Sequence, residues 1–436
     1  MNLARLEELR PDQFRDRFGW MIGVAVLAVT LGLLVVEWRD ERPGRLAGAG
    51  ATAVLGLLLG GLLFVPALPR LAAAVELFAG RMPPPPSGPL PVASLDLTLP
   101  PPAEGGAPIV ARLWLPATTA GLPPPGCVAA LAALRPAGNA RVPIVLYAPA
   151  IDGTRDQNSL AAADLASHGY AVLAIDDISH DPLPPGADAE TVATQKLVLD
   201  FSTLDAYAAT VRRGGEKTRL EAEKALAALD RLQACATALP DLAWRERLDF
   251  AKVGFFGWSF GGSTAAEAEA IDPRVVAAVN MDGWLFGAAA SGGLAGKPYF
   301  LMTSDYAIGA DKLRSPDAGT RYYWGFTNYD LGRQHRLLAG PRGYGITIRN
   351  AWHESFSDRI FSRAFLKSWL TLDPLRAEAI VNAYLRAFFD TYLKGEPSPL
   401  LKRNPSPYPE VELLHTSAHW RKGTATAPTI SAAGSK

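Results

Sequence analysis

The chain has 436 residues, of which 43 are basic and 43 acidic, so its formal net charge is zero. This balance gives no support for a nucleic-acid or polyanion binder, which would need a basic surplus. Hydrophobic residues make up 49% and charged residues 20%, which excludes disorder for most of the chain, and two cysteines, Cys127 and Cys235, exclude a disulfide scaffold and a cysteine-only metal site.

The hydrophobicity is concentrated near the N-terminus. Two uncharged stretches, Phe18–Val36 and Leu46–Leu68, are each long enough to cross a hydrocarbon core of about 30 Å as a helix. Residues 1–82 are therefore predicted to form an N-terminal tail and a transmembrane hairpin with helices at about 18–36 and 46–68. The alternative is a buried soluble hairpin; a cleaved signal peptide fits poorly, because the first apolar stretch is too long.

Arginines flank these two stretches unevenly. Six lie on the side that the N-tail shares with the rest of the protein, and three lie in the connecting loop: Arg5, Arg10, Arg15, Arg17, Arg70 and Arg81 against Arg39, Arg42 and Arg45. The positive-inside tendency predicts a bacterial inner-membrane protein with its large domain in the cytoplasm. The orientation inverts if the second stretch does not span.

The remaining chain divides by composition. A proline-rich stretch at 83–92 is typical of a semi-rigid linker. A large domain is predicted over 93–400. Residues 401–436 are rich in Pro, Ser, Thr and Ala and are predicted to form a flexible tail.

Within the large domain, β-rich runs alternate with helical ones. Two runs predict an opening antiparallel pair and six predict buried strands: 95–100 and 109–117, then 142–150, 170–178, 252–258, 275–283, 297–304 and 345–352. Helices are predicted at 159–169, within 187–239 and at 376–394. This order predicts an α/β fold, with a mostly parallel sheet covered by helices on both faces.

The segment Gly257-Trp258-Ser259-Phe260-Gly261 follows a predicted strand and precedes a predicted helix. A serine on such a sharp turn is a candidate nucleophile, and glycines at the flanking positions avoid collisions with neighbouring backbone. The alternative is an ordinary turn serine. The strand–turn–helix context favours the nucleophile.

A nucleophilic serine needs a base, which an acid orients. Four histidines follow Ser259 in the sequence: His335 in a predicted polar loop, His353 after a predicted strand, and His415 and His419 near the tail. Asp282 and Asp305 each follow a predicted strand and compete for the role of the acid. Position alone does not decide between them.

Four segments, GWSFGG, MDGWLF, TIRNAWHESFSD and DLASHGY, together resemble the platelet-activating factor acetylhydrolase family of α/β-hydrolases over residues 95–394. The resemblance implies an α/β-hydrolase fold with Ser259 as nucleophile, Asp282 as acid and His353 as base. That family is calcium-independent, so no metal is expected. The sequence also carries no nucleotide-binding fingerprint, so no cofactor is expected.

The oxyanion hole needs two backbone N–H donors. Phe260, directly after the nucleophile, is one candidate. The family has an HGLG-like turn where this chain has Pro149–Gly153, which implies Ile151 as the second donor. The chain departs from the family here and at Trp258, which replaces a histidine.

We therefore expect a membrane-anchored serine esterase that acts through an acyl-enzyme on short-acyl phospholipids or other small esters. An acyltransferase with the same residues and a non-catalytic membrane-tethered binding module are the alternatives. Four aromatic residues near the motifs predict either an acyl pocket or plain core: Trp258, Trp284, Phe286 and Phe356.

Overall fold

A computed structural model describes residues 83–101, 107–119, 121–240, 243–306, 308–361 and 371–414. The two predicted transmembrane stretches and the end of the predicted tail lie outside these ranges. Within them, no helix is both long and apolar enough to span a bilayer. The chain divides into two compact units, 1–83 with 360–376 and 84–359 with 377–436. The second unit contains the sheet and every candidate site residue.

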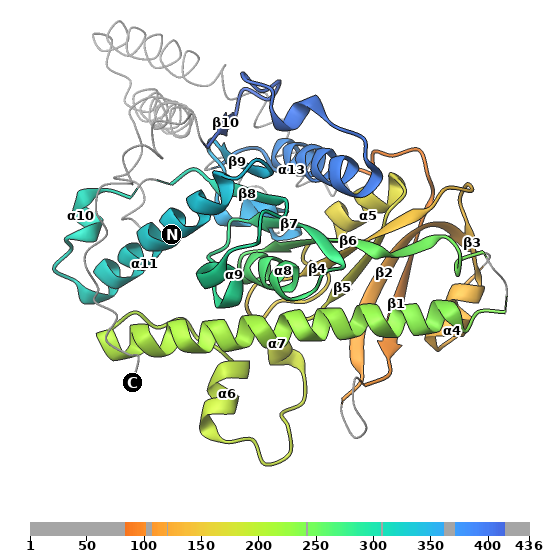
Figure 1. Cartoon of the computed structure of the whole chain (residues 1–436), viewed down its shortest axis with the longest axis horizontal. Helices are drawn as coiled ribbons and strands as arrows, with labels where there is room; N and C mark the ends of the chain where they lie inside the picture. Colours follow the sequence, from red (N-terminus) through yellow and green to blue (C-terminus); the bar gives the residue numbers. More distant parts are fainter. Residues whose placement is uncertain are drawn as a thin grey trace, which may run out of the picture. The chain divides into compact units, whose positions relative to one another are not determined.

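One mixed sheet forms the centre of the second unit, in the order β1-β2-β5-β4-β6-β7-β8-β9-β10, with β3 paired to β2 (Figure 1). The strands have the following bounds: β1 Val92–Leu99, β2 Ile109–Thr119, β3 Leu134–Pro136, β4 Val142–Ala148, β5 Ala171–Ile175, β6 Leu248–Trp258, β7 Val275–Met281, β8 Tyr299–Ser304, β9 Gly343–Ile348 and β10 Val411–Leu413. The strands from β5 to β9 run parallel, whereas β1, β2 and β10 pair antiparallel. The predicted opening pair and the mostly parallel sheet are confirmed.

Burial along the strands follows from their position in the sheet. Every residue of β4, β5 and β8 is buried, because helices cover both faces there. The edge strand β1 instead alternates buried and exposed residues. The apolar runs in the sequence correspond to the first pattern and the alternating run 95–100 to the second.

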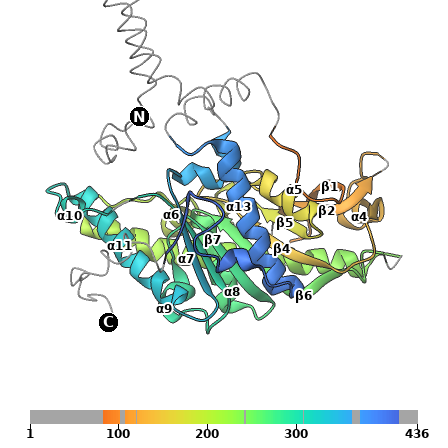
Figure 2. The ribbon, with the colours of Figure 1, turned by 90° about the horizontal axis from the view of Figure 1, so that it is seen from above.

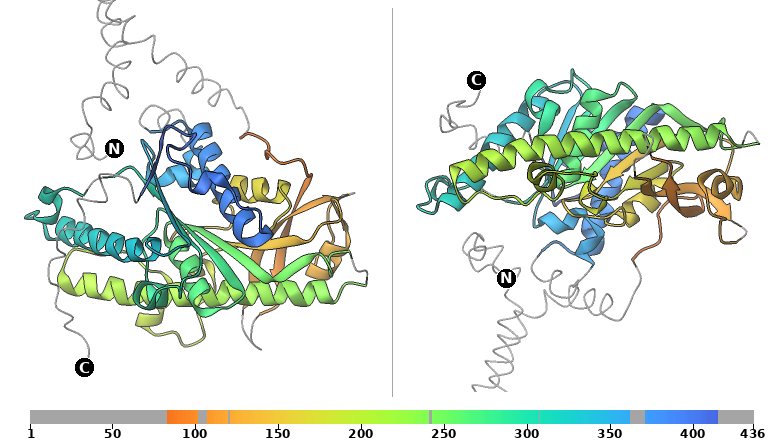
Figure 3. Two further views of the ribbon diagram at one scale, coloured as in Figure 1. Left: turned by 45° about the horizontal axis from the view of Figure 1, so that its top comes forward. Right: turned by 90° about the horizontal axis from the view of Figure 1, so that it is seen from below.

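Helices cover both faces of the sheet (Figures 1 and 3). Their bounds are α4 Cys127–Ala132, α5 Ser159–Ser167, α6 Ala189–Gln195, α7 Leu204–Thr237, α8 Phe260–Ile271, α9 Gly287–Gly292, α10 Ala310–Leu313, α11 Ala318–Leu338 and α13 Pro374–Phe389. Short 3-10 turns lie at Ile178–His180, His353–Phe356, Asp358–Ile360 and Pro399–Leu401, and a π turn at Asp390–Lys394 continues α13. Helices α7, α8 and α9 lie on one face, and α5 and α13 lie on the other; Figure 2 shows α13 lying across the strands.

Two segments differ from the sequence-based expectation. The sequence predicts a polar loop around His335, but His335 lies in helix α11. The polar residues Asp330 and Gln334 of that helix are buried and do not face solvent. Strand β10 lies within residues predicted as a flexible tail. Val411 and Leu413 are buried there, and the strand pairs antiparallel with β9, which gives this short segment a fixed place at the sheet edge.

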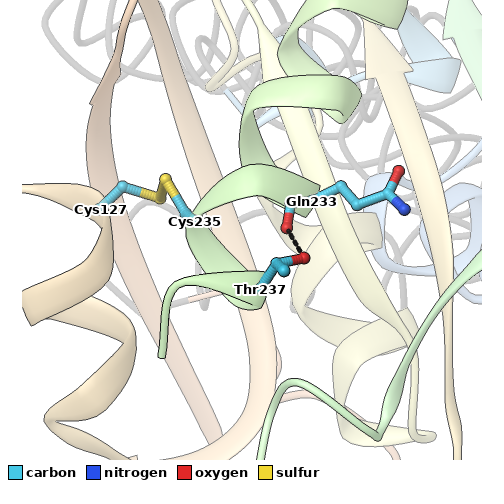
Figure 4. The surroundings of a disulfide bond; sticks show 4 residues. All are labelled: Cys127, Gln233, Cys235 and Thr237. Atoms are coloured by element: carbon cyan, nitrogen blue, oxygen red, sulfur yellow. Dashed lines mark hydrogen bonds between the residues drawn. A yellow bond between two sulfur atoms is a disulfide. The ribbon is translucent and has the colours of Figure 1, made fainter. Parts of the chain in front are cut away.

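The two cysteines form a disulfide between α4 and α7 (Figure 4). The Cα atoms of Cys127 and Cys235 lie 5.9 Å apart, and 108 residues separate them in sequence. A single bridge across so long a loop restricts the unfolded chain, and so stabilises the fold, without being a disulfide scaffold.

Candidate active site

Ser259 lies in the turn between β6 and α8. Its backbone adopts φ 58° and ψ −122°, a left-handed φ that is uncommon for a residue with a side chain. Its N–H donates to the Met281 carbonyl over 2.8 Å, which ties the turn to the end of the neighbouring strand β7. The turn therefore lies at the carboxyl edge of the sheet, with the N-terminus of α8 directly behind it.

Glycines make this turn possible because nothing larger fits. A Cβ on Gly257 would lie 2.0 Å from the Gly261 carbonyl oxygen, and one on Gly261 would lie 2.0 Å from that of Ala148. A Cβ on Gly262 would lie 2.0 Å from Asn280 Oδ1. The steric reason given for the glycines in the sequence is confirmed.

Asp282 follows β7 and also has a positive φ, 59°. Its Oδ1 accepts hydrogen bonds from the Ser304 N–H over 2.7 Å and from the Ser304 hydroxyl over 2.9 Å. Its own N–H donates to the Met302 carbonyl. The carboxylate is thus nearly buried, with a side chain 6% exposed, and is held by the last residue of β8. Sequence reasoning missed Ser304, although a polar residue at the end of the next strand is a usable signal.

His353 lies next to Asp282. Its Nδ1 is 2.7 Å from Asp282 Oδ2. Because a carboxylate only accepts, Nδ1 is the donor in this contact, and in a neutral imidazole Nε2 then has a free lone pair. The imidazole remains 42% exposed and therefore accessible to substrate. The part of the chain that the structure describes contains no hydrogen bond between the Ser259 hydroxyl and His353.

The competing residues have other surroundings. Asp305 Oδ2 accepts from the Asn350 N–H over 3.0 Å, and the Asp305 N–H donates to the Ala351 carbonyl over 3.2 Å. Asp305 thereby holds the turn that leads from β9 to His353. His335 lies on α11, and His415 and His419 fall outside the described residues. Asp282 is the one of the two competing aspartates whose carboxylate lies within 2.7 Å of His353 Nδ1.

A buried polar network fixes the turn after Asp282. Asn280 accepts from the Gly283 N–H over 2.8 Å and donates to the Gly283 carbonyl over 2.9 Å. Gln334, on α11, donates to the same carbonyl and to Asp330, whose Oδ1 accepts from the Leu285 N–H. Burial raises the pKa of Asp330, although Arg333 and these donors oppose the rise. The polar residues of α11 thus hold the backbone that carries Asp282.

The two candidate oxyanion donors belong to one apolar cluster. Phe260 is the first residue of α8, so its N–H has no partner within the helix. Ile151 is half-buried and packs against the cluster that contains Phe260, and Gly153 closes its turn by donating to the Ala150 carbonyl over 2.9 Å. The Asp152 side chain is 77% exposed and accepts from the Ser179 hydroxyl.

Beneath these donors lies a fully buried ionic cluster that the sequence did not reveal. Lys217, on α7, donates to Asp177 Oδ1 over 2.6 Å and lies 3.0 Å from Glu221 Oε1. Its ammonium lies 5.8 Å from the centre of the Phe260 ring. The Asp177 N–H donates to the Gly153 carbonyl. The cluster therefore contacts both segments that carry the candidate donors.

The three groups of this cluster have different protonation preferences. Burial raises the pKa of Glu221 to about 8, and the neighbouring Asp177 carboxylate adds to the rise. Burial also opposes ionisation of Asp177, but Lys217 and the hydrogen bonds from its neighbours lower its pKa below the ordinary value. The two carboxyl groups therefore differ at neutral pH: Asp177 is ionised, whereas Glu221 is largely protonated.

The aromatic residues near the motifs are mostly core. Trp258, Phe286 and Phe356 are 1–3% exposed. Trp284 is half-buried and meets Phe326 edge-on with ring centres 5.1 Å apart. Of the four predicted pocket residues, only Trp284 has substantial surface to offer a ligand.

The described residues contain no cluster of three His, Cys, Asp or Glu side chains suited to a metal ion. The half-exposed His353 has a carboxylate partner, as a catalytic base requires. The arrangement of a serine, a histidine and an aspartate at one sheet edge is suited to nucleophilic chemistry that needs no metal.

Comparison with known proteins gives related matches. Residues 127–311 match the family model described as platelet-activating factor acetylhydrolase, isoform II, a range that includes Ser259 and Asp282 but ends before His353. The chain is 25% identical over 292 residues to a probable 1-alkyl-2-acetylglycerophosphocholine esterase of Arthroderma benhamiae, covering 63% of this chain and 67% of the relative. It is also similar to the solved structure of a ferulic acid esterase from Streptomyces cinnamoneus, with 25% identity and a TM-score of 0.50 over 75% of this chain and 97% of the other.

Proposed function

We propose that Ser259, His353 and Asp282 are the nucleophile, base and acid of this chain. The chain is a platelet-activating factor acetylhydrolase-like serine carboxylic ester hydrolase. The observation that carries this proposal is the 2.7 Å contact between His353 Nδ1 and Asp282 Oδ2 at the edge where Ser259 lies in its strained turn. Ser259 and Asp282 follow neighbouring strands, and His353 follows the last parallel strand of the sheet, as α/β-hydrolase chain order requires.

In the first half of the reaction, His353 Nε2 takes the proton of the Ser259 hydroxyl as Oγ forms a bond to the ester carbonyl carbon. The carbonyl electrons move onto oxygen, and the N–H groups of Phe260 and Ile151 stabilise the oxyanion. The oxyanion collapses, the bond to the alkoxy oxygen breaks, and the proton on Nε2 goes to the leaving alcohol.

The second half repeats these steps with water. His353 takes a proton from water, the hydroxide oxygen bonds to the acyl carbon, and the released proton returns to Ser259 Oγ as the acid departs. Asp282 stays ionised throughout and stabilises the imidazolium that forms twice. Its two bonds from Ser304 keep the carboxylate oriented toward His353 Nδ1.

For the substrate we propose a short-acyl phospholipid or another small ester. The name of the fungal relative supports a glycerophosphocholine ester with a short acyl group. Half-buried Trp284, two residues after Asp282, offers an aromatic surface to the acyl or alcohol part. A chain-length series of phospholipid and nitrophenyl esters tests this proposal, because a short-acyl site loses activity steeply as the acyl chain grows.

For location we keep the predicted hairpin at 18–36 and 46–68 as the anchor, with the large domain in the cytoplasm. The disulfide points to the other side, because disulfides form and persist mainly in oxidising compartments. Trapping of free thiols in intact cells decides between the two predictions. Rapid alkylation of Cys127 and Cys235 supports the cytoplasm; protection until reduction places the domain outside it.

An active-site-directed fluorophosphonate tests the catalytic proposal. Wild type should be labelled, and Ser259→Ala should be neither labelled nor active. Ser263→Ala is the matched control: it removes a buried serine of helix α8, four residues after Ser259, and it should still be labelled. Absence of labelling in wild type would instead favour a non-catalytic binding module, and acyl products on an alcohol acceptor would favour an acyltransferase.

A further inference from the structure

Trp258 occupies the position directly before Ser259, where the family motif has a histidine. Its indole N–H donates to the backbone carbonyl of His353 over 2.8 Å. Its ring also packs against the imidazole, with ring centres 5.2 Å apart and planes inclined by 35°. One side chain thus contacts both the backbone and the ring of the same histidine.

The surroundings of Trp258 leave it little freedom. The residue is 2% exposed, and β6 fixes its backbone between the neighbouring strands β4 and β7. The Arg359 guanidinium carbon lies 5.8 Å from the centre of the indole. A rigid ring in this position can transfer the geometry of the central sheet to His353.

His353 itself has weaker local support. It lies in a single 3-10 turn that begins after β9 and in which Ser355 bonds to the backbone of Trp352. Its side chain is 42% exposed, so packing on its outer side is sparse. Within the described residues, His353 contacts Asp282 through its imidazole and Trp258 through its ring and its backbone carbonyl.

We propose that Trp258 is a positioning residue that replaces the family's histidine and aligns the His353 imidazole between Asp282 and Ser259. This inference rests on the proposed function, because it assigns Trp258 a role through the base. The hydrogen bond from the indole N–H holds the His353 backbone carbonyl in place, and the indole face orients the plane of the imidazole.

Two substitutions separate these contributions. Trp258→Phe keeps an aromatic face but removes the N–H donor, and kcat should fall about tenfold, the worth of one buried hydrogen bond. Trp258→Leu removes the face as well, and kcat should fall about a hundredfold. KM should stay within about twofold in both, because Trp258 is buried behind the base and does not reach substrate.

Trp244→Phe is the matched control. Trp244 is also buried, at 1% exposed, and its indole N–H donates to a backbone carbonyl, that of Leu134, over 3.3 Å. It lies beside β3, away from His353. The control should lose stability like Trp258→Phe while kcat stays at the wild-type value.

A spectroscopic measurement separates positioning from general stability. The proton between His353 Nδ1 and Asp282 Oδ2 should give a low-field NMR resonance in the wild type, which Trp258→Phe broadens or moves and Trp244→Phe preserves. Wild-type kcat with an unchanged resonance in Trp258→Phe would overturn the proposal, as would an equal loss of kcat in the Trp244 control.

Misfolding of Trp258→Phe and failure of the proposed function can each be recognised. If Trp258→Phe does not fold, Trp258→His serves in its place: the imidazole Nε2–H lies where the indole N–H lies and can still donate to the His353 carbonyl, while the larger ring face is lost. The fall in kcat should then be smaller than in Trp258→Leu, and an equal fall would overturn the role given to the N–H. A wild type that a fluorophosphonate does not label, or a Ser259→Ala variant that stays active, refutes the proposed function instead and is recognisable without any Trp258 variant.

Discussion

The two sides of Ser259 are built by opposite means. On the side of the proposed base, Asp282 and His353 follow strands β7 and β9 and are joined by one direct hydrogen bond at a half-exposed edge. On the side of the oxyanion donors, Ile151 and Phe260 are themselves apolar, and the charged groups lie behind them, fully buried in α7 and the turn after β5.

This difference determines what each side contributes. In the proposed mechanism, His353 must be accessible and must change protonation, whereas the nearly buried Asp282 only orients it. On the oxyanion side the reacting groups are backbone N–H donors, and the side chains have only to hold them still. Buried charges are suited to holding a backbone in place. A movement that separated them would leave a buried charge without compensation, which is costly.

The largest expected effect separates the two candidate acids on the base side. Asp282→Asn should lower kcat by about 10⁴-fold, because an amide cannot hold the imidazole in the tautomer that frees Nε2. Asp305→Asn should change kcat less than about threefold, since the new amide oxygen can still accept from the Asn350 N–H. Steady-state kinetics on a short-chain ester measures both, and the reverse order would refute Asp282 as the acid.

The oxyanion side is tested through its buried lysine. Lys217→Met leaves Asp177 and Glu221 without their cation and should lower the free energy of unfolding by about 3–5 kcal/mol. Arg219→Met, two residues along α7, removes an exposed partner of Glu216 and Glu223 and should cost less than about 1 kcal/mol. Urea unfolding gives both values, and equal losses would show that burial of the charge does not matter.

The turn between the two sides is tested by a single methyl group. A Cβ on Gly283 would lie 1.9 Å from the Ser259 carbonyl oxygen, so Gly283→Ala should displace the nucleophile turn at a cost of about 1–3 kcal/mol, with loss of activity. Gly292→Ala, at the end of α9 with no atom near the added methyl, is the control. Thermal unfolding of both variants gives the comparison, and equal melting temperatures would contradict the steric account.

A pH dependence of stability tests Glu221, in the same buried cluster. The folded-state pKa of Glu221 is raised to about 8, so the native protein binds a proton there that the unfolded chain releases near pH 4.5. This contribution to stability is fully present below pH 4.5 and is lost as the pH rises toward about 8. The groups that face it are Asp177 and Lys217, with the Thr264 hydroxyl donating to Oε2.

Glu221→Gln should therefore flatten the fall in unfolding free energy between pH 5 and pH 8, because glutamine keeps the shape of the protonated acid and does not titrate. Urea unfolding at several pH values across this range measures the slope. A variant with the wild-type slope would show that Glu221 is not protonated in the folded protein.

The sequence predicted the base side better than the oxyanion side. Ser259, Asp282 and His353 each follow a predicted strand, and parallel strands bring their carboxyl ends to one edge of a sheet. The strand pattern therefore predicts that these three residues lie near one another. The choice between Asp282 and Asp305 was not, because it depends on which carboxylate the turn after β9 meets, and that required the family resemblance.

Helical segments concealed the rest. The stretch around Lys217 has the composition of a solvated helix, and only the packing of α7 on α8 buries its lysine with two carboxylates. Likewise, the polar loop predicted around His335 is part of α11, whose Asp330 and Gln334 bind the turn after Asp282. Polar residues that serve the backbone of another segment give no periodic signal, so sequence reasoning assigns them to solvent.

In the proposed mechanism, Ser259 carries the acyl group between the two halves of the reaction. The most direct measurement is rapid mixing with p-nitrophenyl acetate, followed by acid quench and peptide mapping by mass spectrometry. We predict an initial burst of nitrophenol and an acetyl group on the peptide that contains Ser259, both absent in Ser259→Ala. Hydrolysis without a burst, or an acetyl group on another residue, would refute Ser259 as the nucleophile.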